Sequence, residues 1–159
     1  MAKRQQYYIA YVLKQVYQDL QGICKPQREQ NKKPLETVYV GHRPSATDNH
    51  SEFLVASLSK SVYSHGPYQN AAFYLDIVVK NKQGGIENTT RLQELLDEVN
   101  RKFPIKCKED EIRWIIKNPQ LVISGDDQLG FTVWRLRGSL FINTVDRYGE
   151  VDEDTNTNP

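Results

Sequence analysis

The chain opens with the periodicity of an amphipathic helix. Between Gln5 and Leu20, apolar residues recur at helical spacing with lysine and glutamine between them, namely Ile9, Leu13, Val16, Tyr17 and Leu20. The pattern predicts a helix that ends near Gly22. The stretch 24–37 is polar and holds two prolines. Because proline interrupts both helix and strand, we expect an exposed connection there.

Three strands are predicted next. Residues 37–40 are β-branched, and residues 51–62 are apolar on both sides, which is typical of a strand buried on both faces. Residues 71–80 alternate between apolar positions and more solvent-exposed ones, so Asp76 is expected on the more solvent-exposed face of the sheet. Turn-forming residues predict the connecting loops at 41–51 and 63–70.

A second helix follows a glycine-containing turn. Asn88 or Thr89 can cap it, and Pro104 stops it. Its apolar stripe consists of Leu92, Leu95, Leu96, Val99 and Phe103. The pattern predicts a helix that lays one face on the sheet.

The last part of the chain predicts a long bent hairpin. Residues 111–116 fit a helix or a strand, whereas 120–125 and 130–144 both read as strands joined by a turn. Gly138 interrupts the last strand. We expect it to mark a bulge or a close backbone approach, and the alternation to change face there.

This order of elements predicts an α+β fold: a mostly antiparallel sheet with two helices packed on one face and a long closing β-hairpin. A chain of 159 residues, 38% of them hydrophobic, can bury one core, so we expect a single domain over residues 1–150. The acidic, polar tail 151–159 is predicted to be disordered.

Charge and cysteine content limit the partners and the cellular compartment that we expect for this protein. The chain has 21 Lys and Arg residues and 20 Asp and Glu residues, so its net charge does not attract nucleic acid or membranes. A charged partner would have to bind to a local group of charged residues. No apolar stretch reaches the ~20 residues of a spanning helix, so we expect a soluble protein without a membrane partner. Cys24 and Cys107 have no metal-ligand spacing, and no apolar leader precedes the first helix. Both features favour a reduced, cytosolic compartment.

No group of reactive residues points to catalysis. All three histidines, His42, His50 and His65, lie in predicted loops. A metal site built from His42, His50 and Asp48 would have no helical or hairpin spacing to hold its geometry. We therefore expect no catalytic residue, no metal and no cofactor. An enzyme that uses Asp76, His42 and His65 is a third hypothesis.

Two glycine-containing turns resemble phosphate-binding and calcium-binding loops but lack the residues that bind the ligand in such loops. The run KNKQGGIENTT lacks the GKS or GKT ending and the GxGxxG spacing of phosphate-binding loops. SGDDQLG lacks the alternate acidic ligands and the closing glutamate of a calcium loop. Both are interpreted as plain turns.

Tyrosine is the residue type that best indicates a role. The chain has nine tyrosines, and tyrosine is enriched at protein interfaces because its ring buries area while its hydroxyl stays hydrogen-bonded. This indicates a subunit of an assembly. The candidate interface or lumen residues are Tyr7, Tyr11, Arg43, Tyr63, Tyr68, Trp134, Arg135 and Arg137.

The alternative is a small nucleic-acid-binding or regulatory protein. It would use a basic, aromatic strand face formed by Trp134, Arg135, Arg137 and Lys80. If the protein is an assembly subunit, Asp76 is expected to pair with Arg135 or Arg137 across strands, contributing about 0.2–1 kcal/mol.

Four segments carry a resemblance to a known group of proteins: YYIAYVLKQVYQDL, AAFYLDIVVKNKQGG, TTRLQELLDEVNRKFP and GFTVWRLRGSLFINTVDRY. In this order they resemble the tail terminator and head-to-tail connector proteins of tailed bacteriophages, including the neck rings of crAss-like phages. The likeness covers residues 5–148 and is one of topology. The loop 41–51 and the acidic tail have no fixed counterpart in that family, so the resemblance does not assign the surface that faces a neighbouring ring.

The resemblance implies a structural virion protein that forms a homo-oligomeric ring, hexameric or twelve-fold, and joins portal or connector to tail. The implied partners are copies of itself, neighbouring portal, connector or tail subunits, and DNA that touches the lumen without sequence readout. The implied location is the neck or tail of the virion, and the host cytoplasm during assembly. The family has no catalytic residues to carry over.

Overall fold

The structure is a computed structural model, and it describes residues 2–25, 33–43, 50–59, 63–65, 68–107 and 113–143. The expected tail 151–159 lies outside these ranges. In the described part the chain folds as α+β, with two helices and one large, mostly antiparallel, curled sheet.

The helices are α1 (Ala2–Leu20), which continues into a 3-10 turn over Gln21–Cys24, and α2 (Thr89–Lys102). The strands are β1 (Val38–Val40), β2 (Glu52–Leu58), β3 (Tyr63–His65), β4 (Tyr68–Lys80), β5 (Ile105–Lys106), β6 (Arg113–Ile116), β7 (Gln120–Asp126) and β8 (Phe131–Asn143). The two expected helices and the closing hairpin are confirmed.

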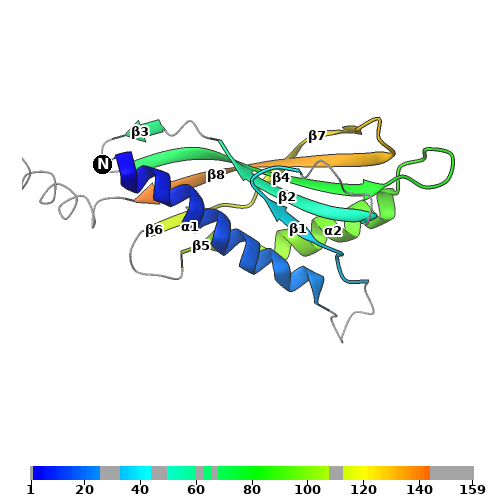
Figure 1. The fold of residues 1–159 in the computed structure, drawn as a ribbon, viewed down its shortest axis with the longest axis horizontal. Helices are drawn as coiled ribbons and strands as arrows, with labels where there is room; N and C mark the ends of the chain where they lie inside the picture. The colour runs from blue at the N-terminus through cyan, green and yellow to red at the C-terminus, as the bar shows by residue number, and fades with distance from the viewer. Residues whose placement is uncertain are drawn as a thin grey trace, which may run out of the picture.

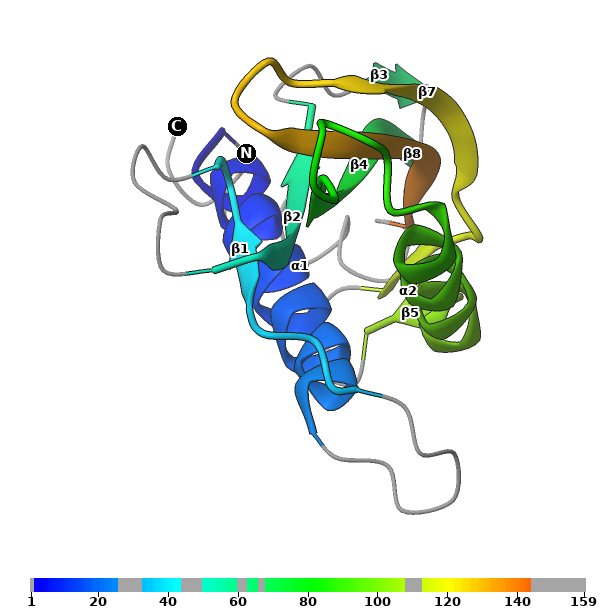
Figure 2. The same cartoon turned by 90° about the vertical axis from the view of Figure 1, so that its right-hand side faces the viewer.

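The sheet is organised around β4 and β8, which pair antiparallel over 13 residues each. The strand order is β1-β2-β4-β8-β6-β5, with β3 pairing with β4 and β7 pairing with β8. Among these pairs, β1 with β2 is parallel and the others are antiparallel. Figures 1 and 2 show both helices on the same face of the sheet.

The core lies between that face and the two helices. In α1 the buried positions are Val12, Val16 and Leu20, and in α2 they are Leu92, Leu95 and Val99. Their spacing of three or four residues turns one stripe of each helix towards the sheet. Asn88 caps α2, because its side-chain oxygen accepts a hydrogen bond from the Arg91 backbone N–H at 3.3 Å.

The long strand β8 does not change face at Gly138, contrary to the expectation. The side chains on the helix-covered face continue in strict alternation through Thr132, Trp134, Leu136, Leu140 and Ile142. Gly138 lies where the neighbour of β8 changes from β7 to β6, and a Cβ there would meet the Lys117 carbonyl oxygen at 3.1 Å. The glycine therefore permits a close backbone approach, and the register shift lies in β7, between Leu121 and Ile123.

Two expected connections are more ordered than the sequence indicated. The 63–70 stretch is not a simple loop, because β3 pairs with the start of β4 and forms a hairpin. The 24–37 connection is not fully exposed either: Leu35 is buried, and its N–H donates to the carbonyl of Ile23. Because a polar, proline-containing stretch gives no periodicity, a single buried leucine within it leaves no pattern to read.

Candidate functional site

The face of the sheet turned away from the helices, called the open face below, has two chemically different halves. At the end near the β7–β8 turn it carries a small apolar cluster around the buried side chains Phe53, Val55 and Val78. This second cluster explains why β2 is buried on both faces, as its sequence predicted. At the other end the open face is polar and basic.

Arg43 covers the apolar half. Its guanidinium lies 5.2 Å from the ring centroid of Phe53 and 5.4 Å from that of Phe131. Its Nη1 donates to Asp127 Oδ2 at 2.8 Å. Arg43, expected at an interface or lumen, is therefore engaged within its own chain.

Asp127 is held in its charged form by this contact and by the turn. Partial burial acts to raise the pKa of Asp127, but hydrogen bonds from Arg43 and from the N–H groups of Leu129 and Phe131 outweigh it and lower the pKa. The stretch SGDDQLG is thus a turn whose Asp127 carboxylate holds Arg43, which lies just after β1.

Asp76 and Arg135 form the predicted cross-strand pair. Arg135 Nε and Nη2 donate to the two carboxylate oxygens of Asp76 at 2.7 and 3.0 Å, and the guanidinium lies 5.4 Å from the Tyr74 ring centroid. Hydrogen bonding to Asp76 raises the pKa of Arg135. Of the two partners expected for Asp76, the structure selects Arg135, which lies directly opposite it in the register.

Arg135 also belongs to a row of four exposed cations on the polar half of the open face. We call this row the basic strip, and it consists of Lys106, Lys117, Arg135 and Arg137. Arg137 is two residues from Arg135 on β8, so both side chains point the same way. The Lys117 ammonium lies 5.1 Å from the ring centroid of Phe141. Lys106 stands opposite Ile115, which in turn stands opposite Phe141.

Trp134 does not belong to this surface. It lies on the helix-covered face, is 9% exposed, and its indole N–H donates to Glu87 Oε1 at 3.0 Å. Trp134 therefore cannot take part in the strand platform expected for nucleic-acid binding. Lys80, the fourth member of that platform, lies opposite Phe131 at the apolar end of the sheet, away from the strip. The alternation along β8 already separates Trp134 from Arg135 and Arg137.

The candidate tyrosines are placed only in part. Tyr11 is 44% exposed on α1. Tyr7 also lies in α1, while Tyr63 and Tyr68 lie in β3 and β4, where they pair with Asn70 and His65, respectively. The side chains of Tyr7, Tyr63 and Tyr68 are outside the described part of the structure, so their role as contacts stays a prediction.

Sequence reasoning missed the outer edge of β7. This strand pairs with β8 on one side, and no described strand pairs with its other side. Leu121 is 45% exposed, Val122 is 51% exposed, and Leu129 in the following turn is 73% exposed. The apolar composition of these residues was visible in the sequence, but composition does not tell an edge strand from a central one.

The histidines do not come together as a metal site in the described residues. His42 is exposed, and His50 lies with its ring edge-on to Tyr39, with 6.3 Å between centroids. Asp48 and the His65 side chain are outside the described part. Within that part, no group of three or more potential metal ligands is found.

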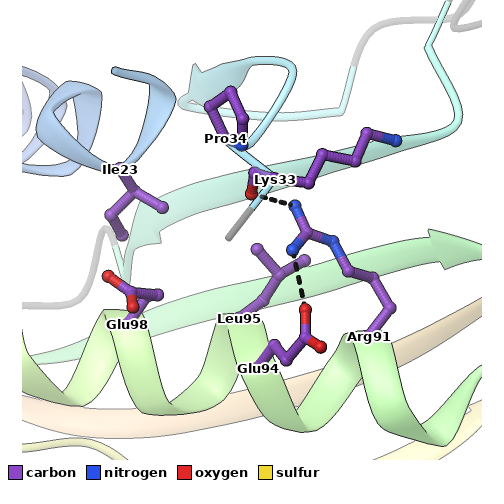
Figure 3. A pocket seen from close by; sticks show the side chains of 7 residues that line it. All are labelled: Ile23, Lys33, Pro34, Arg91, Glu94, Leu95 and Glu98. Carbon is purple, nitrogen blue, oxygen red and sulfur yellow. Dashed lines mark hydrogen bonds and ion pairs between the residues drawn. The ribbon is translucent and has the colours of Figure 1, made fainter. Parts of the chain in front are cut away.

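A shallow hollow lies between α2 and the segment that leads into β1 (Figure 3). It is lined by Ile23, Lys33, Pro34, Arg91, Glu94, Leu95 and Glu98, and it has room for about one water molecule. Its size therefore allows no organic ligand.

Arg91, the most buried cation of this hollow, is fully engaged by its own chain. Its Nε and Nη2 donate to Glu52 at 2.9 and 2.6 Å, Nη2 also donates to the Lys33 carbonyl at 2.9 Å, and Nη1 donates to Glu94 at 3.0 Å. Burial acts to lower the pKa of Arg91, but the hydrogen bonds to Glu52 and Glu94 outweigh it and raise the pKa. The network joins α2, β2 and the connection before β1.

Cys24 and Cys107 are both unpaired and partly buried. Burial raises the pKa of the Cys24 thiol, and the nearby Glu52 carboxylate raises it further. A raised pKa leaves little of the reactive thiolate at neutral pH. The structure therefore gives no support for a nucleophilic role of Cys24.

Comparison with known proteins gives a fold and no activity. No family model and no curated protein matches the chain. Among solved structures, a similar chain has a TM-score of 0.59 and 9% sequence identity, over 87% of this chain and 95% of that chain. At this identity the likeness shows the fold alone, and the name of that chain states no activity. Within the described residues, no helix has both the length and the apolar character needed to cross a membrane.

Proposed function

We propose that this protein is a structural, non-catalytic subunit that assembles with copies of itself into a ring in the neck or tail of a bacteriophage virion. In this role it joins portal or connector subunits to the tail, and it assembles in the host cytoplasm. The resemblance of its four segments to tail terminator and head-to-tail connector proteins supports this proposal. The α+β topology agrees with it.

The observation that carries the proposal is the apolar outer edge of β7. An edge strand presents unpaired N–H and C=O groups, which pair readily with a strand from another chain. Most monomeric proteins protect such edges with lysine, proline or a covering element. In β7 the side chains next to the edge include the exposed Leu121 and Val122, which favours burial against a neighbour.

The position of this edge suits a head-to-tail assembly. Across the centre of the sheet the strands run β1-β2-β4-β8-β7, so β7 lies at one edge and β1 at the other. Contact between the β7 edge of one subunit and the β1 edge of the next is heterologous. A heterologous contact builds a ring when its rotation closes.

Mass photometry and negative-stain images of the purified full-length protein test this proposal. We expect discrete rings of identical subunits at micromolar concentration. The double variant L121K/V122K should remain monomeric, because it places two charges on the edge that must be desolvated. Its circular dichroism and melting temperature should stay close to those of the unmodified protein, since both positions are exposed.

Ile86→Lys is the matched control. Ile86 is 62% exposed, more than Leu121, but it lies in the turn after β4 and outside the β7 edge. This variant should assemble normally. The proposal is wrong if the unmodified protein stays monomeric at every concentration, or if L121K/V122K forms the same rings.

A further inference from the structure

One half of the open face is basic, although the chain as a whole carries a net charge of only +1. The basic strip places four cations on one half of the open face. Asp76 is the only carboxylate on the open face of the described strands, and it is paired with Arg135. Among the described residues, this half of the open face therefore carries a local excess of positive charge, which the near-neutral composition does not indicate.

The register of the strands places the cations of the strip in a definite order across the sheet. Arg135 and Arg137 are two positions apart along β8, or about 7 Å. Lys117 comes next, where the chain passes Gly138, and Lys106 lies further along, across β6. The strip thus crosses β8, β6 and β5 as a row, the arrangement that fits a linear polyanion.

Two members of the strip have no competing partner among the described side chains. Neither Arg137 nor Lys106 makes a hydrogen bond or an ion pair with any of them, and both are exposed. Their charges are available to a ligand without first breaking a contact inside the described part of the protein.

The aromatic rings of the same face are already covered. Arg135 lies over Tyr74, and Lys117 lies over Phe141. Bases of a single strand would have to displace these cations in order to stack on the rings. Phosphates need only the cations, so the geometry favours the backbone of a duplex over unpaired bases.

We propose that the basic strip binds the phosphate backbone of duplex DNA without sequence readout. This inference does not need the ring, because the strip is complete in one chain. In a ring, each copy would add another strip, and the weak contacts would reinforce one another.

Fluorescence anisotropy with a labelled duplex of about 30 base pairs, from about 20 to 200 mM salt, tests the inference on the full-length protein. We expect binding that weakens with salt. The triple variant K106Q/K117Q/R137Q should bind at least about tenfold more weakly at low salt, and its log–log salt slope should be smaller by about 0.9 for each phosphate that the variant no longer neutralises. Arg135 is left unchanged because it is tied to Asp76.

The triple variant K14Q/K25Q/K82Q is the matched control. It removes the same number of exposed cations, all outside the strip, and should bind like the unmodified protein. The same assay with a single strand of the same sequence should show weaker binding than the duplex.

Several results would overturn the inference. They are no duplex binding at the lowest salt, equally weakened binding in the two triple variants, or preference for the single strand. The competing hypothesis is that the acidic segment after Asn143, and not DNA, binds to the strip. If only the full-length variant D152N/E153Q/D154N binds duplex, and K106Q/K117Q/R137Q abolishes that binding, then the tail and not DNA occupies the strip. Mass photometry of the same samples reports assembly separately, so failure of the ring and failure of DNA binding are distinguishable.

Discussion

At the scale of single residues, register decides which charges meet. Asp76 could have paired with either arginine of β8 on sequence grounds, but Arg135 stands directly opposite it and Arg137 stands opposite Tyr74. The pair is bidentate, and the Arg135 side chain remains 44% exposed. Water therefore screens the pair, and its contribution to stability is small.

A double-mutant cycle measures that contribution. With D76N, R135Q and the combined variant, urea unfolding should give a coupling free energy of about 0.2–1 kcal/mol. The control cycle D76N with R137Q should give no coupling, because Arg137 faces a different residue. Equal coupling free energies in both cycles would mean that the bidentate contact between Asp76 and Arg135 contributes no more to stability than the proximity of Asp76 to Arg137.

At the scale of elements, Arg43 links the described residues just after β1 to the β7–β8 turn. Arg43 joins Asp127 and also covers Phe53 and Phe131. No periodicity in the 41–51 stretch indicated this, since a long-range ion pair leaves no local pattern. Asp127 directly follows β7, so the contact lies at one end of the strand whose outer edge is proposed for assembly.

The stability that the contact between Arg43 and Asp127 contributes should decrease in acid. Because the pKa of Asp127 is lowered in the folded protein, its stabilising contribution is present above the unfolded value of about 3.9 and disappears as the pH falls through the lower folded value. D127N should therefore be less stable than the unmodified protein at pH 7, and this difference should shrink in acid. Urea unfolding at pH 7 and at about pH 3 measures it. A difference that stays constant with pH would show that the charge of Asp127 does not carry the contact.

At the scale of the whole molecule, a buried ion pair ties the helix layer to the sheet. Glu52 is 2% exposed and Arg91 is 9% exposed, and Arg91 also holds the carbonyl of Lys33. The two apolar clusters lie on opposite faces of β2, and Glu52 begins that strand. The network thus fixes how α2, β2 and the connection before β1 are placed relative to one another.

Removing one partner of the Glu52–Arg91 ion pair should lower the free energy of unfolding. E52Q leaves Arg91 buried without its main counter-charge, which is expected to lower the free energy of unfolding by about 3–5 kcal/mol. The control D97N changes an exposed carboxylate of α2 and should cost less than about 0.5 kcal/mol. Thermal and urea unfolding compare the two. Similar stabilities for E52Q and D97N would contradict the structural role of the pair.

The sequence alone determined both helices, the longer strands and the face of the sheet on which Asp76 lies. Helical and twofold periodicity depend only on neighbouring residues, so α1, α2, the face of Asp76 and the closing hairpin followed directly from the pattern. The helical cap at Asn88 was also readable, because capping is a local interaction.

Only the tertiary structure decided which segments meet. Contacts between distant residues decide the β3 hairpin, the burial of Leu35 and of the Trp134 side chain, the close approach at Gly138 and the pairing of Arg43 with Asp127. The same holds for the basic strip and the outer edge of β7, because strand order and register bring their residues together. A chain with almost equal numbers of cations and anions can be charged on one face, since net charge sums over residues and a surface selects among them.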